Sequence, residues 1–283
     1  MKNSVLTIIT ILAWAIGAQA QIMNVSSVEQ LNIKNDGRSV MQAVAISPQG
    51  DYVLLSSDTH KGLVKWDLAS GKSTKLTDKE GTGSDVRISE DGQQITYSET
   101  SIKNKRRRQA FKSMDLKTGK SKTLAGPTRG AEGYSSSDNT GRPVLSHRHL
   151  KLYITRNGET TLLAPNGADE HYIWASLSPS ANRVLYYVSG YGAYVCDIDG
   201  SHVIEMGNLT APRWWNDDTI VGMDEQDDEY AIIASKIVAR TISGETQVLT
   251  GDDVIATYPQ PSSESGKIIF STPDGQIYLI TID

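Results

Sequence analysis

The sequence is poor in cysteine, in positive charge and in long apolar runs, and each shortage excludes a class of protein. Cys196 is the only cysteine in 283 residues, so the chain forms no internal disulfide and the fold must depend on its apolar core. The net charge of −5 argues against a general nucleic-acid binder. After residue 20, no apolar run is long enough to cross a membrane.

The first twenty residues have the features of a secretory signal peptide. Lys2 supplies a positive charge, Val5–Ile16 is apolar, and residues 18–20 (Ala-Gln-Ala) form a small-x-small cleavage site, so we expect cleavage before Gln21. The apolar run is shorter than the roughly 20 residues that span a bilayer, which disfavours the alternative, an uncleaved membrane anchor. Because Cys196 lies far from the cleavage site, the acylated anchor of a lipoprotein is excluded. These features predict a periplasmic or secreted protein.

The rest of the sequence repeats a pattern of short apolar runs joined by turns. The stretch from Ala43 to Thr77 contains four such runs, which predicts a four-stranded antiparallel meander. A Ser-Pro-Gln-Gly turn at residues 47–50 precedes the apolar run Tyr52–Leu55, and related turns precede apolar pairs or triplets further along the chain. The six turns begin at Ser47, Ser89, Ser137, Ser178, Trp215 and Ser263. Such self-similarity predicts a repeat architecture.

A later turn repeats as well, and the interval between copies sets the architecture. Its glycines are Gly71, Gly119, Gly158, Gly200 and Gly244. The mean interval of about 43 residues is typical of four-stranded propeller blades, and residues 21–283 hold about six such intervals. We therefore predict an all-β protein, a six-bladed β-propeller of four-stranded antiparallel blades in a single domain. The blades are expected to start near residues 43, 85, 132, 173, 211 and 256.

The two ends of the chain complement each other. The sixth copy lacks a fourth strand, whereas a spare strand at Ser27–Asn32 precedes the first copy. Pairing this strand with the sixth copy would close the ring and remove both open sheet edges. Closure of this kind favours a propeller over an open solenoid.

The first turn and the apolar run after it carry a family resemblance. Residues 47–55, Ser-Pro-Gln-Gly-Asp-Tyr-Val-Leu-Leu, resemble the propeller repeat of the TolB-like family of bacterial periplasmic proteins, and the resemblance covers nearly all of residues 21–283. It implies a propeller that binds a protein partner in the cell envelope. TolB itself carries a mixed α/β domain before its propeller, and the segment between Gln21 and the first copy is too short for one.

Two inserted loops carry opposite charges. Copy two inserts residues 101–108, with Arg106, Arg107 and Arg108, and copy five inserts residues 224–229, with Asp224, Asp227 and Asp228. Blades two and five of a six-bladed ring are diametrically opposed, so we expect a positive and a negative rim on one face, across the central opening. Such a dipole would steer and orient a charged partner. The alternative is two disordered, solvated loops.

The first strand of each blade should line the central channel with alternate side chains. The candidates, two positions ahead of each turn, are Ala45, Arg87, Ser135, Ser176, Arg213 and Gln260. Arg87 and Arg213 could hold a carboxylate or phosphate, or could be structural and paired with a neighbour such as Asp85. Four aromatic residues near these strands, Tyr172, Trp174, Trp214 and Tyr258, could be partner anchors, sugar platforms or packing between blades.

Little in the sequence supports catalysis. It has no Gly-x-Ser-x-Gly motif, and Cys196 ends an apolar strand, where a buried and inert thiol is expected. His147, His149 and His171 could meet between adjacent blades, as in oligogalacturonate-lyase-type propellers that use a histidine cluster for a metal, but their spacing matches no metal motif. We therefore predict a monomeric, non-catalytic, protein-binding propeller with no cofactor and no metal. The alternative is a carbohydrate-binding or lyase-type propeller with a histidine and aromatic site.

Overall fold

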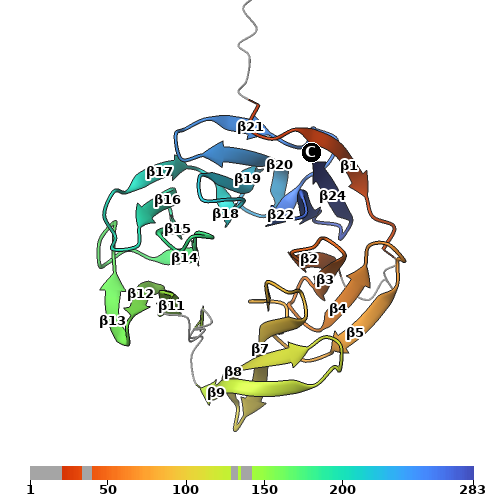
Figure 1. Cartoon of the computed structure of the whole chain (residues 1–283), viewed down its shortest axis with the longest axis horizontal. Helices are drawn as coiled ribbons and strands as arrows, with labels where there is room; N and C mark the ends of the chain where they lie inside the picture. Colours follow the sequence, from red (N-terminus) through yellow and green to blue (C-terminus); the bar gives the residue numbers. More distant parts are fainter. Residues whose placement is uncertain (1–20, 34–39, 129–132, 135–141) are drawn as a thin grey trace, which may run out of the picture.

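The protein is a ring of six four-stranded antiparallel sheets around a central axis (Figure 1). The computed structural model describes residues 21–33, 40–128, 133–134 and 142–283. The expected signal peptide, Ser135 and the turn beginning at Ser137 lie outside the described residues. Every described element is a strand, and the described part of the chain offers no helix able to cross a membrane. The prediction of an all-β, six-bladed propeller is confirmed.

Each blade runs from an inner strand beside the axis to an outer strand at the rim (Figure 1). Blade one contains β2 (Met41–Ile46), β3 (Tyr52–Ser57), β4 (Leu63–Asp67) and β5 (Ser73–Thr77). Blade two contains β6 (Arg87–Ile88), β7 (Gln94–Lys103), β8 (Arg106–Asp115) and β9 (Ser121–Thr128). Blade three contains β10 (Gly133–Tyr134), β11 (Val144–Arg148), β12 (Lys151–Arg156) and β13 (Glu159–Leu163).

The second half of the ring repeats this order until the last blade. Blade four contains β14 (Tyr172–Leu177), β15 (Arg183–Val188), β16 (Gly192–Asp197) and β17 (Ile204–Gly207). Blade five contains β18 (Thr210–Trp214), β19 (Thr219–Asp227), β20 (Ile232–Thr241) and β21 (Thr246–Val248). Blade six contains β22 (Thr257–Ser262), β23 (Lys267–Ser271), β24 (Ile277–Ile282) and the N-terminal strand β1 (Val25–Gln30).

Ring closure depends on pairing between the first and last strands of the chain. β1 is antiparallel to β24, with Val28 opposite Ile280 and Gln30 opposite Tyr278. The amide of Leu31 extends the ladder by donating to the carbonyl of Ile277 at 2.8 Å. The closing strand begins and ends two residues earlier than the expected Ser27–Asn32. Closure by the N-terminal strand is nevertheless as predicted.

Serine hydroxyls hold the first turns of blades one, two and four, at Ser47, Ser89 and Ser178. In blade one, Oγ of Ser47 accepts from the backbone amides of Asp51 at 3.0 Å and Tyr52 at 3.1 Å. Oγ of Ser178 accepts in the same way from the amide of Arg183 at 3.3 Å in blade four. A serine hydroxyl satisfies backbone donors that a tight turn leaves without a ladder partner.

The apolar core lies between the blades rather than inside any one of them. Blades five and six share a cluster in which Val221, Met223 and Ile237 of one blade pack with Ile268 and Phe270 of the next. Similar clusters join blades one and two, three and four, four and five, and six and one. Since each sheet has two apolar faces, it is stable only between two neighbours.

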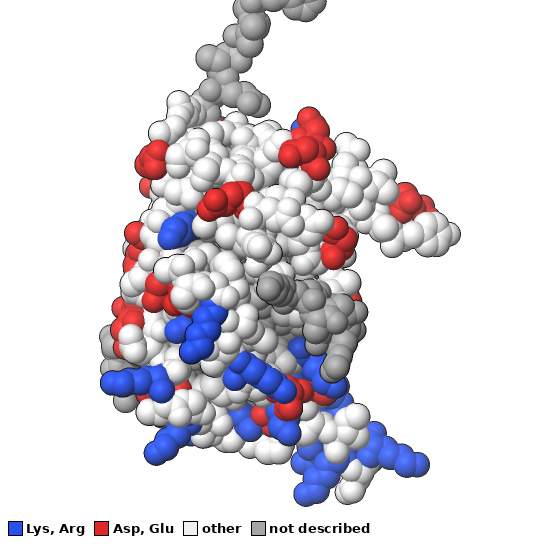
Figure 2. All heavy atoms as spheres, turned by 90° about the vertical axis from the view of Figure 1, so that its right-hand side faces the viewer, with Lys and Arg blue, Asp and Glu red and all other residues white. Residues whose placement is uncertain are grey.

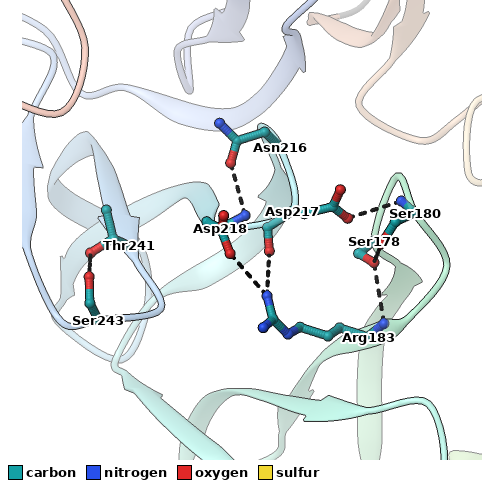
Figure 3. A network of polar contacts seen from close by, with 8 residues as sticks. All are labelled: Ser178, Ser180, Arg183, Asn216, Asp217, Asp218, Thr241 and Ser243. Atoms are coloured by element: carbon teal, nitrogen blue, oxygen red, sulfur yellow. Dashed lines mark hydrogen bonds and ion pairs between the residues drawn. The ribbon is translucent and has the colours of Figure 1, made fainter.

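Polar contacts between first turns join neighbouring blades on the face away from the long hairpins. Between blades four and five, Nη1 of Arg183 donates to the carbonyl of Asp217 and to Oδ1 of Asp218, both at 3.0 Å (Figure 3). Oδ1 of Asp217 accepts from the amide of Ser180 at 2.9 Å (Figure 3). Between blades six and one, Nζ of Lys267 donates to the carbonyl of Gly50 at 2.8 Å. The turn motif therefore contributes to the ring as well as to its own hairpin.

A substitution at Gly50 tests whether the close contact between blades six and one stabilises the ring. Its φ is +65°, and a Cβ added there would lie 2.5 Å from Cβ of Ser265 in blade six. Gly119 has a φ of +68° with no atom within 4 Å of an added Cβ. We expect Gly50→Ala to lower the free energy of unfolding by about 2 to 4 kcal/mol and Gly119→Ala by only about 1 kcal/mol, because both strain the backbone but only the first clashes. Equal losses in urea unfolding would contradict this interpretation.

Candidate functional site

A cavity of about 1230 Å³ occupies the centre of the ring. The inner strands of several blades line it, together with residues of the two long hairpins that follow β7 and β19. Of the channel candidates, Arg87, Ser176, Arg213 and Gln260 line the cavity, whereas Ala45 packs against the core between blades one and two. Ala45 is thus a correction: a break in strand register between Ala43 and Ala45 separates it from the lining.

A bulge at the same place in three inner strands aims side chains into the cavity. Trp174, Ala211 and Tyr258 have φ values of +50°, +46° and +53°, and the strand register shifts at each of them. A left-handed conformation is costly for residues other than glycine, and such strain clusters at functional sites. The residue two positions after each bulge is Ser176, Arg213 or Gln260, all of which line the cavity. The bulges therefore place polar groups at one level around the axis, in three neighbouring blades.

The charged residues of the cavity form a small cluster. Nε of Arg87 lies 3.6 Å from Oδ1 of Asp85, so Arg87 has the neighbouring partner that the sequence suggests. Arg213, which is partly buried, donates from Nε to Oε1 of Gln260 at 3.4 Å and from Nη1 to the carbonyl of Pro212 at 3.3 Å. Burial lowers the pKa of Arg213, the charge of Arg87 lowers it further, and Asp85 raises it. Both arginines and Asp85 are therefore close enough to interact electrostatically.

The aromatic candidates separate into two groups. Trp174 and Tyr258 line the cavity, and Tyr258 is exposed. Tyr172 is fully buried, and its hydroxyl donates to the carbonyl of Gly167 at 2.8 Å. Trp214 packs between blades four and five, and its Nε1 donates to the carbonyl of Ser176 at 3.3 Å. Trp174 and Tyr258 can thus contact a ligand, whereas Tyr172 and Trp214 stabilise the fold.

The histidines do not form a shared site. His147 and His149 line the cavity and His171 does not, and the described residues contain no group of three histidine, cysteine or acidic side chains placed to hold a metal. Nε2 of His147 lies 2.7 Å from the carbonyl of Tyr172, so this nitrogen carries the proton and donates. Burial lowers the pKa of His147 below its ordinary value. His147 acts as a neutral contact between blades three and four.

The basic insertion is a two-stranded hairpin, not a loop. Residues 101–103 extend β7 and Arg106, Arg107 and Arg108 begin β8, so the expectation of a solvated loop at 101–108 is wrong. Asn104 and Lys105 alone form the turn, with φ values of +53° and +59°, the conformation of a two-residue type I′ turn. The expectation failed because alternating polar residues can also form a strand when a partner strand is available.

The three arginines of the basic hairpin point to different sides. Arg107, Gln109 and Phe111 line the cavity, as alternate residues of one strand do. Arg106 and Arg108 therefore belong to the opposite face of β8. Arg106 is exposed, and Nε of Arg108 is buried without a hydrogen-bond partner among the described residues.

The acidic insertion is a hairpin as well. Asp224 and Asp227 lie on β19, and Asp228 begins the turn to β20, so residues 224–227 are strand rather than loop. Oδ1 of Asp228 accepts from the amides of Tyr230 at 3.1 Å and Ala231 at 2.9 Å, and these bonds lower the pKa of Asp228. Asp228 thus holds the turn in addition to carrying charge.

The two hairpins project from one face of the ring on opposite sides of its opening. Figure 2 shows a basic projection and an acid-tipped projection that extend in the same direction from the two ends of the molecule. Each hairpin also exposes a large apolar side chain, Ile102 at 79 % and Tyr230 at 93 %. The predicted opposition of charges is therefore present in the geometry, on strands instead of loops.

Cys196 has no access to a substrate. It is fully buried at the end of β16, and burial raises the pKa of its thiol to about 12. A thiol of this kind is protonated at neutral pH and does not react as a nucleophile.

Sequence reasoning missed several residues of this face. Gln109 and Phe111 on β8, and Ala231 and Ile232 on the acidic hairpin, line the cavity, and Tyr230 is the most exposed large apolar side chain of the described residues. The signal that could have revealed the basic hairpin was Asn104 at the turn, because asparagine favours the positive φ of a two-residue turn between paired strands.

Comparison with solved structures places the fold among known propellers. No protein-family model and no curated protein sequence matches the chain. A putative TolB from Agrobacterium tumefaciens superposes with a TM-score of 0.60 at 18 % identity, over 92 % of this chain and 99 % of that one. An oligogalacturonate lyase in complex with manganese gives a TM-score of 0.52 at 15 % identity, over 84 % of this chain and 76 % of that one. The resemblance to TolB-like propellers is confirmed for the fold, and a fold shared with a lyase does not choose a function.

Burial of His147 makes the stability depend on pH. The folded-state pKa of His147 lies below the unfolded value of about 6.5, so the unfolded chain binds the additional proton. The free energy of unfolding should therefore fall as the pH decreases through about 6.5. We expect His147→Gln, which keeps a donor for the carbonyl of Tyr172, to have a smaller loss between pH 7.5 and pH 5. Urea unfolding at the two pH values measures the difference, and an unchanged loss would show that His147 does not cause it.

Proposed function

We propose that the chain is an exported, non-catalytic, protein-binding propeller of the cell envelope. The observation that carries the proposal is the pair of oppositely charged hairpins, β7–β8 and β19–β20, on one face of the ring (Figure 2). Export is supported by the signal-peptide features of residues 1–20. The TolB-like fold supports an envelope role by analogy only.

The hairpins suit a protein partner because they combine charge with apolar anchors. The basic side carries Lys103, Lys105 and Arg106–Arg108, and the acidic side carries Asp224, Asp227 and Asp228. Opposite charges across the opening orient an approaching partner and raise its rate of association. Ile102 and Tyr230 then offer exposed apolar surface at the two tips, and tyrosine is enriched among residues that dominate binding energy.

The ordered turns of the two hairpins also favour binding of a protein partner. The turn at Asn104 and Lys105 is tight, and the turn after β19 is held by the amides of residues 229–231, which donate to the carboxylates of Asp227 and Asp228. A preformed hairpin loses less conformational freedom on binding than a flexible loop does. The proposal therefore treats each hairpin as a fixed arm of the contact face.

The second candidate function is carbohydrate binding. It is favoured by Trp174 and Tyr258, which line the cavity and offer aromatic faces to a sugar ring. A glycan-binding screen and metal analysis of the purified protein separate the two candidates. A glycan hit that is lost in Trp174→Ala, or metal in equal molar amount, would favour the carbohydrate candidate over protein binding.

Removal of the arginine charges tests the steering role of the basic hairpin. We expect the triple variant Arg106→Ser, Arg107→Ser and Arg108→Ser to capture the envelope partner about tenfold more slowly at low ionic strength, with little difference at high salt. The matched control replaces Lys117, Lys120 and Lys122 by Ser, which removes the same charge from exposed positions at the other end of blade two. Capture kinetics from envelope extracts on immobilised protein measure both.

Two outcomes would contradict protein binding through this face. One is an equal effect of the control variant, since that would assign the change to net charge alone. The other is a capture profile unaffected by both the arginine variant and Tyr230→Ala, because no anchor or charge of the hairpins would then take part.

A further inference from the structure

Arg213 places a positive charge in the cavity beside neutral partners. Its guanidinium donates to the amide oxygen of Gln260 and to the carbonyl of Pro212, and within the described ranges no carboxylate lies within ion-pair distance of it. Asp85 is paired with Arg87 at 3.6 Å, so it compensates one of the two arginine charges. A partly buried guanidinium without a counter-ion is costly, which leaves room for a ligand that supplies one.

The neighbouring positions add donors rather than acceptors. Ser176 occupies the place of Arg213 in blade four, and its Oγ is buried with no hydrogen-bond partner among the residues that the structure describes. Gln260 occupies the same place in blade six, and because its oxygen accepts from Arg213, its NH₂ group remains available to donate. A buried hydroxyl without a partner needs an explanation, and a row of guanidinium, amide and hydroxyl donors fits an anion.

The charge of the cavity differs from that of the whole chain. The chain has a net charge of −5, whereas the cavity lining contains three arginines (Arg87, Arg107 and Arg213) and two aspartates (Asp58 and Asp85). A positive lining in an acidic protein concentrates field lines and favours an anionic ligand over a cation.

We propose that the central cavity binds a carboxylate at Arg213, with Gln260, Ser176 and Arg87 as additional donors. The planar guanidinium presents parallel N–H groups whose spacing matches the two oxygens of a carboxylate. Ser176 and Gln260 flank Arg213 on the adjacent inner strands, so their donors converge on the same anion. Apolar lining from Ile173 and Ala175 strengthens the electrostatic attraction by lowering the local dielectric.

This site does not rest on the proposed protein-binding function. The carboxylate could be the free carboxylate of a small metabolite or the C-terminal carboxylate of a peptide, and both present the same two oxygens. The experiment therefore uses acetate as the small probe and Gly-Gly-Gly, as free acid and as amide, as the peptide probe. Acetamide serves as the neutral isostere of acetate, and inorganic phosphate as the competing anion.

Titration of the mature protein with these probes at constant ionic strength tests the ligand class. We expect acetate to bind with a dissociation constant on the order of millimolar, as its small size permits, and acetamide to bind at least about tenfold more weakly. Gly-Gly-Gly acid binding tighter than acetate would assign the site to a chain terminus, whereas equal binding would assign it to a small carboxylate; both support the site. Equal binding of acetate and acetamide, or tighter binding of phosphate with the same dependence on Arg213, would overturn the assignment to a carboxylate.

Variants locate the binding at Arg213. Gln260→Glu places a carboxylate at hydrogen-bond distance from Nε of Arg213, so we expect it to raise the unfolding temperature and to abolish acetate binding while the protein stays folded. Arg213→Lys should weaken acetate binding at least about tenfold, because it keeps the charge and loses the planar fork. Arg156→Gln, at an exposed position outside the cavity, is the control for charge.

The variants can also refute the site. Acetate binding to Gln260→Glu with wild-type affinity, together with an unchanged unfolding temperature, would show that Arg213 is not the anchor. A loss of acetate binding in Arg156→Gln equal to the loss in Arg213→Lys would show that general surface charge, and not the cavity, attracts the anion.

Discussion

The pairing of β1 with β24 is the constraint on which the rest of the molecule depends. Apolar clusters join five of the six pairs of neighbouring blades, including blades six and one, so an open row of six would leave two strand edges and the apolar faces of its end blades exposed to water and to other chains. Joining the first strand of the fold to the last blade converts the row into a ring. The apolar clusters between blades can then be buried without the internal disulfide that a single cysteine excludes.

A closed ring also determines where function can occur. Six inner strands cannot approach the axis closely enough to fill it, so a cavity of about 1230 Å³ remains in the centre. The bulges at Trp174, Ala211 and Tyr258 take the inner strands out of regular geometry at the same level in three consecutive blades. That strain is maintained by the surrounding sheets, and its effect is to line the cavity with polar side chains that a regular strand would turn elsewhere.

Local chemistry made much of the fold predictable from the sequence. Five of the six first turns begin with a serine, glycines such as Gly50 and Gly71 recur in the turns, and an apolar run follows each first turn. These features act over a few residues, so their repetition revealed the blades and their number. The channel positions Arg87, Ser176, Arg213 and Gln260 followed from the same register. The missing fourth strand of the sixth copy could also be recognised in the sequence, because the repeat predicts four strands in every copy.

What the sequence did not reveal depends on how strands pair with one another and how blades pack together. Residues 101–108 lack an apolar pattern, and only the pairing of β7 with β8 makes them a strand. The position of Ala45 outside the cavity results from a register shift against β3, which no local pattern encodes. The same holds for the partners of Arg213. Its neighbours come from blades five and six, so its lack of a counter-ion among the described residues can be recognised only when the ring is closed.

Strand β8 belongs both to the cavity and to the projecting rim. One of its faces carries Arg107 into the cavity, while the other contributes Arg106 to the rim. A ligand at the rim would therefore contact a strand that also lines the cavity, and the positive charge of β8 that attracts this ligand also favours an anion in the cavity.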